Sequence, residues 1–255
     1  MKIISKLYTI VALLVASILI ANPAYAQAER VKVAIIDTGV VVENSYPDAV
    51  VTRYDARPGR EIAVDTRSGR QWGSKHGTWV AGALLNEVQD DVEILSYRVE
   101  SKCRGNECDI RLREIYNAAL HAVAQDAKIL IISSAGAMPA SVQDMFADIA
   151  AQGVHLVFSA GNNGGTSPYI RLASLNRDYI HVVGALDKDG DKARFSDDDD
   201  GQDLFRWYPG EDIHTVDPSG ASRVVDGTSY STSLLAADLV RDLRKPTYDL
   251  ASIRY

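Results

Sequence analysis

Five short runs rich in Val, Ile and Leu limit the folds open to this chain more than any other feature. Runs of this length and composition are typical of strands that are covered on both faces of a sheet. Each is too short to form a long helix, and each is followed by residues that break the apolar pattern. The five runs span residues 31–36, 92–99, 129–133, 154–159 and 179–183.

Helical patterns separate several of these runs. Leu112, Ile115 and Ala119 recur at three- and four-residue spacing, and Asp109 is placed to cap the helix that this spacing predicts. Residues 140–151 repeat the pattern more weakly. Strands that alternate with helices predict an α/β fold, with a mostly parallel central sheet flanked by helices.

Residues 1–26 have the features of a signal peptide. Lys2 and Lys6 precede an apolar stretch, and Ala24-Tyr25-Ala26 fits the small-x-small pattern of a cleavage site. We therefore expect a secreted or periplasmic protein whose residues 27–255 form one compact domain, with no evident propeptide before the first strand. No later apolar stretch reaches the roughly 20 residues that a membrane helix needs.

The charge of the chain argues against two classes of partner. The formal net charge is −7, and it becomes −9 when the signal segment with its two lysines and no acidic residue is removed. An acidic protein is poorly suited to bind nucleic acid or an anionic membrane surface. We expect a monomer.

The two cysteines, Cys103 and Cys108, are separated by four residues. In an oxidising compartment, such a pair predicts a disulfide that closes a small loop. The alternative is a metal site, but two further ligands are not found nearby in the sequence.

Three separated residue types supply the parts of a nucleophilic site. Asp37 follows the first apolar run, His76 opens a segment of small residues, and Ser229 precedes an apolar helical pattern. A serine hydroxyl needs a base within hydrogen-bond reach, and the base needs a third group that fixes its tautomer. The end of a strand and the start of a helix are suitable places for such groups, because parallel strands gather functional residues at their carboxyl ends.

The order Asp37-Thr38-Gly39, His76-Gly77-Thr78, Ser159-Ala160-Gly161-Asn162 and Gly227-Thr228-Ser229 resembles that of the subtilase family of serine peptidases. The resemblance implies a subtilisin-like three-layer fold and an endopeptidase with a triad of Asp37, His76 and Ser229. It implies that the Asn162 amide donates to the oxyanion. It also implies that an extended peptide or protein substrate contacts Ser133, Ser134, Ala135, Gly136, Ser159, Ala160 and Gly161.

One departure from the family keeps a second function open. Relatives commonly continue after the nucleophile as Met-Ala-Ser/Thr-Pro, whereas this chain continues as Tyr230-Ser231-Thr232-Ser233. A proline would preorganise the first helical turn. The alternative is therefore a catalytically impaired protein of the same fold that binds peptides or a protein partner.

Two other interpretations concern the aspartates. Asp37-Thr38-Gly39 suits an aspartic protease, but the motif occurs once and leaves His76 and Ser229 unexplained. We expect no required cofactor. The aspartates at 187–191 and 197–200 leave a structural calcium open, although a solvated acidic loop is favoured because the terminal glutamate of a helix-loop-helix calcium loop is missing.

Overall fold

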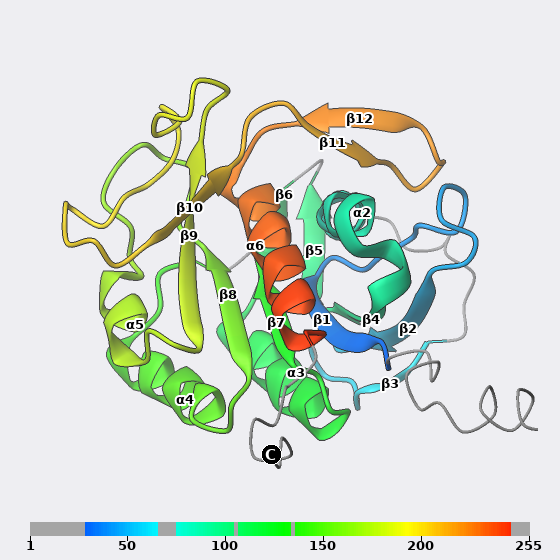
Figure 1. The fold of residues 1–255 in the computed structure, drawn as a ribbon. Helices are drawn as coiled ribbons and strands as arrows, with labels where there is room; N and C mark the ends of the chain where they lie inside the picture. The colour runs from blue at the N-terminus through cyan, green and yellow to red at the C-terminus, as the bar shows by residue number, and fades with distance from the viewer. Residues whose placement is uncertain (1–28, 66–74, 105–106, 134–135, 246–255) are drawn as a thin grey trace, which may run out of the picture.

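The computed structural model describes residues 29–65, 75–104, 107–133 and 136–245, and for residues 101–104 and 107–108 it describes the backbone alone. Within these ranges an eight-stranded sheet forms the centre of the molecule, in the order β10-β9-β8-β7-β1-β4-β2-β3 (Figure 1). Its neighbouring strands pair in parallel, except that β3 pairs antiparallel with β2. The strands are β1 (Val31–Asp37), β2 (Val50–Asp55), β3 (Ala63–Val64), β4 (Val92–Arg98), β7 (Ile129–Ile132), β8 (His155–Ser159), β9 (Ile180–Leu186) and β10 (Arg206–Pro209).

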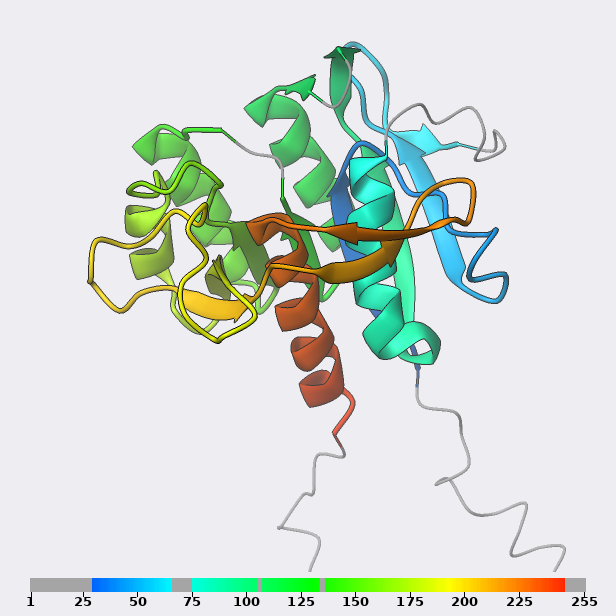
Figure 2. The same ribbon diagram turned by 90° about the horizontal axis from the view of Figure 1, so that it is seen from above.

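Helices cover both faces of the sheet, so the molecule has three layers (Figure 2). On one side lie α2 (His76–Val88), which is followed by the short η3 (Gln89–Asp91), and α6 (Thr228–Leu243). On the other side lie α3 (Leu112–Ala124), α4 (Ala140–Ala150) and α5 (Ile170–Leu175). The predicted α/β fold with a mostly parallel sheet is therefore confirmed.

The central strand β1 shows why the central strands of the sheet are apolar along their length. Ala34 and Ile36 contribute to the core under α3 and α4, whereas Val33 and Ile35 contribute to the core under α2 and α6. Successive residues of a strand point to opposite faces, so a strand between two helical layers has no solvent-facing side. This explains the continuous apolar runs in the sequence.

Two hairpins of the described chain lie outside the central sheet. The antiparallel pair β11 (Ile213–Val216) and β12 (Ser222–Val225) packs along α2, where the Thr215 hydroxyl donates to the Trp79 carbonyl at 2.7 Å. The pair β5 (Glu100–Arg104) and β6 (Glu107–Ile110) precedes α3. Asp109 belongs to β6, and α3 begins at Leu112 with Arg111 at its N-cap position and no side-chain cap, so the predicted capping role of Asp109 is wrong.

The carboxyl ends of the strands meet along one edge of the sheet. Asp37 is the last residue of β1 and pairs with Arg98 at the end of β4, while Ser159 ends β8. No helix in the described part of the chain is both long and apolar enough to cross a membrane.

Candidate active site

Asp37 and His76 form a close polar contact at this edge. The Nδ1 atom of His76 lies 2.9 Å from Oδ2 and 3.0 Å from Oδ1 of Asp37. The Asp37 carboxylate is also an acceptor for the backbone N–H of Thr38 at 2.7 Å. Because Nδ1 donates to the carboxylate, Nε2 of the neutral imidazole is left as the acceptor.

Burial and charge act in opposite directions on this pair. Burial raises the pKa of Asp37, but the charge of His76, the hydrogen bond to it and the hydrogen bonds from Thr38 together more than offset this, so the pKa of Asp37 is lowered. For His76, burial lowers the pKa, but the charge of Asp37 and the hydrogen bond to it more than offset this, so the pKa of His76 is raised above 6.5. The pair therefore stabilises an imidazolium that forms at His76.

Close packing at the start of α2 holds His76 in place. A Cβ atom on Gly77 would lie 2.5 Å from the carbonyl oxygen of Gly39 and 3.2 Å from Cβ of Asp37. The Gly77 N–H donates to the Thr38 hydroxyl at 3.0 Å. The Thr78 hydroxyl accepts from the Val41 N–H at 3.0 Å. The small residues after His76 thus allow α2 to contact the loop that follows β1.

Ser229 lies in the first turn of α6, where backbone N–H groups have no partner within the helix. Gly227 precedes the helix with a φ of 150°, a conformation that side-chain-bearing residues rarely adopt. The Ser229 side chain is buried, and its hydroxyl donates to the Ser133 carbonyl at 3.2 Å. In this arrangement the single hydroxyl hydrogen of Ser229 is directed at Ser133 and not at His76.

Asn162 is held through its side-chain oxygen. Its Oδ1 accepts from the Thr228 N–H and from the Thr228 hydroxyl, each at 2.9 Å. Because Oδ1 of Asn162 accepts these two hydrogen bonds, the nitrogen Nδ2 of the same side-chain amide remains as a donor. A Cβ atom on Gly227 would lie 3.5 Å from this nitrogen, which places the amide beside the segment that carries Ser229.

The unusual segment after Ser229 is buried, and its hydroxyls are bonded to other elements. Ser231 donates to the Pro209 carbonyl at 3.0 Å, and Ser233 donates to the Val80 carbonyl at 2.9 Å. Thr232 and Ser133 share a hydrogen bond of 3.0 Å. The Tyr230 ring lies 6.0 Å, centroid to centroid, from the His76 ring. The first two turns of α6 are therefore held by tertiary hydrogen bonds in place of a proline.

The residues expected to contact substrate come from two neighbouring strand ends. Ser133 follows β7, while Ser159 ends β8 and is followed by Ala160 and Gly161. The Gly136 carbonyl accepts from the Tyr169 hydroxyl at 2.6 Å, which links the segment after β7 to the start of α5. Ser134 and Ala135 lie outside the described residues.

The acidic residues proposed as calcium ligands make local hydrogen bonds. Asp187 accepts from the N–H groups of Asp189 and Asp191, and Asp199 accepts from those of Leu204 and Phe205. No group of three or more ligating His, Cys, Asp or Glu side chains occurs among the described residues. The calcium alternative stays an untested prediction.

The cysteines are opposite each other in the β5–β6 ladder, where Cys103 pairs with Cys108. Their side chains lie outside the described part of the structure. The disulfide therefore stays a prediction.

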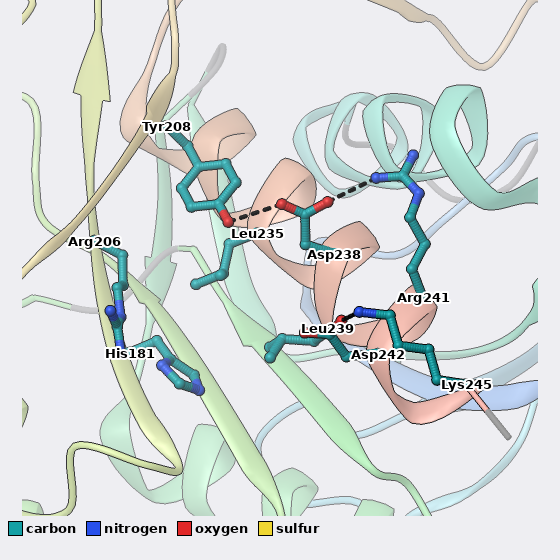
Figure 3. Close-up of a pocket in the computed structure, with 9 residues that line it drawn as sticks. All are labelled: His181, Arg206, Tyr208, Leu235, Asp238, Leu239, Arg241, Asp242 and Lys245. Atoms are coloured by element: carbon teal, nitrogen blue, oxygen red, sulfur yellow. Dashed lines mark hydrogen bonds and ion pairs between the residues drawn. The ribbon is translucent and has the colours of Figure 1, made fainter. Parts of the chain in front are cut away.

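A separate cavity of about 460 Å³ lies between α6 and the strands β9 and β10 (Figure 3). Tyr208 donates to Asp238 at its upper rim, and Asp238 also pairs with Arg241. None of Asp37, His76 and Ser229 lines this cavity, so it is distinct from the candidate active site. Its lining residues are His181, Arg206, Tyr208, Leu235, Asp238, Leu239, Arg241, Asp242 and Lys245.

Two residues that position the site, Thr38 and Thr228, belong to the sequence motifs but were given no role from the sequence. Thr38 contacts both Asp37 and Gly77, and Thr228 holds Asn162. Both are immediate neighbours of expected functional residues, Asp37 and Ser229, which is the one signal that could have indicated them. The contact of Ser133 with Ser229 joins residues 96 positions apart and has no local signal.

Comparison with known proteins agrees with the motifs. The family model described as "Subtilase family" matches residues 28–241. The chain is 28% identical over 225 residues to a protein of Paenibacillus polymyxa named "Intracellular serine protease". The alignment covers 82% of this chain but 65% of that relative, so the chain spans slightly less than two thirds of the relative's length.

Solved structures share the fold at low sequence identity. A cold-adapted subtilisin-like serine proteinase superposes with a TM-score of 0.66 at 21% identity, covering 84% of this chain and 75% of that one. The prenylagaramide maturation protease PagA gives a TM-score of 0.62 at 23% identity, covering 81% of this chain and 73% of that one. The subtilisin-like three-layer fold expected from the sequence is thereby confirmed.

Proposed function

Because this chain belongs to the subtilase family, we propose that it is a serine endopeptidase in which Ser229 attacks the carbonyl carbon of a peptide bond. The observation that carries the proposal is the contact of His76 Nδ1 with both carboxylate oxygens of Asp37, at the sheet edge to which α6 brings Ser229. This contact fixes the tautomer in which Nε2 accepts a proton.

Acylation follows from these roles. A bond forms between Ser229 Oγ and the substrate carbonyl carbon while the hydroxyl proton moves to His76 Nε2. The protonated His76 then donates that proton to the leaving amine as the C–N bond breaks. Water attacks the resulting acyl-enzyme with His76 again as the base, and Ser229 regains its proton.

Asn162 would stabilise the negative oxygen that forms during both steps. Its side-chain oxygen is occupied by Thr228, so its amide nitrogen is oriented to donate. The Ser229 N–H in the first turn of α6 and the dipole of the helix would favour negative charge at the same place. In subtilisin, the loss of one such donor costs about 10²–10³-fold in kcat, or about 2.7–4 kcal/mol.

The substrate would bind as an extended chain. Ser133 directly follows β7, beside Ser159 at the end of β8. Main-chain hydrogen bonds from such edges bind a peptide with little dependence on its side chains.

One observation favours the alternative of an impaired, peptide-binding protein. The Ser229 hydroxyl donates to Ser133 and not to His76. Catalytic hydrogen bonds are often long or poorly aligned without substrate and tighten when it binds. We therefore favour the active enzyme.

The test is labelling with a fluorophosphonate probe, which reacts with activated serines. Intact-mass analysis of the full chain should show a single adduct, and the adduct should be absent in Ser229→Ala. Ser45→Ala is a suitable control, since Ser45 is a serine of the loop after β1 that bonds to the Gly220 carbonyl. A folded wild-type protein that gains no adduct would make the peptide-binding alternative the better account.

Export, a single 27–255 domain and a monomeric state are also part of the proposal. Export is supported by the sequence of residues 1–26, which lie outside the described structure, and the curated relative that is named as intracellular does not support it. N-terminal sequencing of protein recovered from outside the cytoplasm should begin near Gln27. Protein that accumulates in the cytoplasm with Met1 intact would contradict export.

A further inference from the structure

Asp197 is a buried carboxylate in the segment between β9 and β10, and its bonds all lead toward one loop. Its side chain is enclosed, with 3% of the residue exposed. Oδ1 accepts from the backbone N–H groups of Asn163 at 2.9 Å and Gly165 at 3.0 Å. Oδ2 is 3.4 Å from the Asn163 side-chain amide. The carboxylate thus holds the two residues that closely follow Asn162.

Backbone hydrogen bonds join the same two segments. The Asp197 N–H donates to the Gly161 carbonyl at 2.9 Å, and the Gly164 N–H donates to the Phe195 carbonyl at 2.7 Å. The Asp198 N–H donates to the Gly165 carbonyl at 2.9 Å. The loop 161–165 is therefore attached to the segment 195–198 on both sides of Asn162.

Gly161 shows how closely the carboxylate approaches the loop. A Cβ atom at position 161 would overlap Oδ2 of Asp197, and the φ of Gly161 is +115°, which strains any residue with a side chain. The carboxylate therefore occupies the space that a side chain on the residue before Asn162 would need.

Charge explains why the attachment is strong. A buried carboxylate is costly unless hydrogen bonds or a cation compensate it. Among the described residues, none of the ion pairs involves Asp197, so the N–H groups of the loop provide its compensation. Hydrogen bonds to an ionised acceptor are roughly twice as strong as neutral ones.

We infer that Asp197 is a positioning residue for the oxyanion donor Asn162. This inference rests on the proposed function of Asn162 and adds a second anchor to it. Thr228 fixes the Asn162 side chain through Oδ1, and Asp197 fixes the backbone that carries that side chain. Both anchors are needed, because an amide that is free to move would lose its alignment with the developing oxyanion.

The test is a double-mutant cycle between Asp197 and Asn162 in the full chain, with kcat and KM measured on a chromogenic peptide substrate. Asp197→Ala should lower kcat by about 10-fold or more, up to the roughly 10²–10³-fold expected from the loss of Asn162, and should change KM by less than about 3-fold. In an Asn162→Ala background, the same change should lower kcat by less than about 3-fold, because the donor is already absent. Asp197→Asn keeps Oδ1 as a neutral and weaker acceptor and should recover part of kcat.

Asp199→Ala is the matched control. Asp199 is also buried and also accepts backbone N–H groups, but from Leu204 and Phe205, away from the loop 161–165. It should lower the melting temperature without the loss of kcat. Equal effects of Asp197→Ala in the two backgrounds, or a kcat loss no larger than that of Asp199→Ala, would overturn the inference.

Amide hydrogen exchange separates this inference from the proposed function. The Asn163 and Gly165 amides should exchange faster in Asp197→Ala than in wild type, and Asp199→Ala should leave them unchanged. A wild-type protein without fluorophosphonate reactivity would contradict the proposed function. Unchanged exchange at both amides in folded Asp197→Ala would contradict the positioning role, whether or not the enzyme is active.

Discussion

Replacement of Gly77 by alanine should uncouple His76 from its partners. The new Cβ would lie 2.5 Å from the Gly39 carbonyl oxygen, where ordinary contacts begin near 3.4 Å, so the first turn of α2 must move by about 1 Å. The atom it meets belongs to the backbone and cannot rotate away. A displacement of this size near the reacting groups costs about 10²-fold in rate, or about 2.7 kcal/mol of transition-state stabilisation. Overpacking should also lower the free energy of unfolding by about 1–3 kcal/mol.

The measurement is kcat on a peptide substrate together with urea unfolding. Gly82→Ala is the matched control on the same helix, because its Cβ would overlap the Thr215 hydroxyl and lie 3.1 Å from the Val216 nitrogen, away from His76. Both variants gain the same helix propensity and both are overpacked. We expect both to be less stable, but only Gly77→Ala to lose kcat, by about 10²-fold. Equal kcat values in the two variants would refute the argument that the packing of Gly77 positions the base.

Three further predictions concern the same site. Asp37 raises the pKa of His76 above 6.5, and His76 must be neutral to accept a proton. The value of kcat/KM should therefore rise with pH through a midpoint above 6.5. A pH profile that is flat from about pH 5 to 8 would exclude His76 as the base. Asp37→Asn should lower kcat by about 10⁴-fold, because an amide at this position favours the wrong tautomer of His76; the same change causes this loss in a serine protease of the chymotrypsin type. The midpoint of the pH profile of kcat/KM should also fall. Retention of kcat within about 10-fold would contradict the role of Asp37. Thr228→Val removes one of the two hydrogen bonds to Asn162 Oδ1, and such a bond is worth about 0.5–1.5 kcal/mol. We therefore expect kcat to fall by about 2- to 13-fold with KM unchanged. An unaltered kcat would show that the Thr228 backbone N–H is enough to hold the Asn162 side chain.

The altered segment after Ser229 has a structural explanation that the sequence did not provide. Serine and threonine usually disfavour a helix when they are exposed, because their hydroxyls compete with the backbone for hydrogen bonds. In the structure they bond to Pro209, Val80 and Ser133 on other elements. The segment that first suggested impaired catalysis therefore anchors the first two turns of α6.

The central strands could be predicted because burial on both faces leaves a direct mark on the sequence. β1, β4, β7, β8 and β9 all lie within one to three residues of the expected runs. β2 was not predicted, because its apolar run is only Val50 and Val51 and is followed by the half-buried Thr52 and Arg53. The same limit applies to β10 and to the hairpin β11–β12, whose residues are mostly exposed or half-buried.

The sequence by itself determined the fold class and the family, because strand burial and the family motifs are both local in the chain. The candidate catalytic residues lie at or close to the end of a strand or the start of a helix that could be recognised from its own residues; they are Asp37, His76, Asn162 and Ser229. Tertiary structure alone decided what holds these groups. Asp197 illustrates this: its acidic neighbourhood suggested a solvated loop or a calcium site, yet its carboxylate is buried against a loop more than 30 residues away. A carboxylate has the same sequence signature in either setting, and only the packed fold determines which N–H groups it meets.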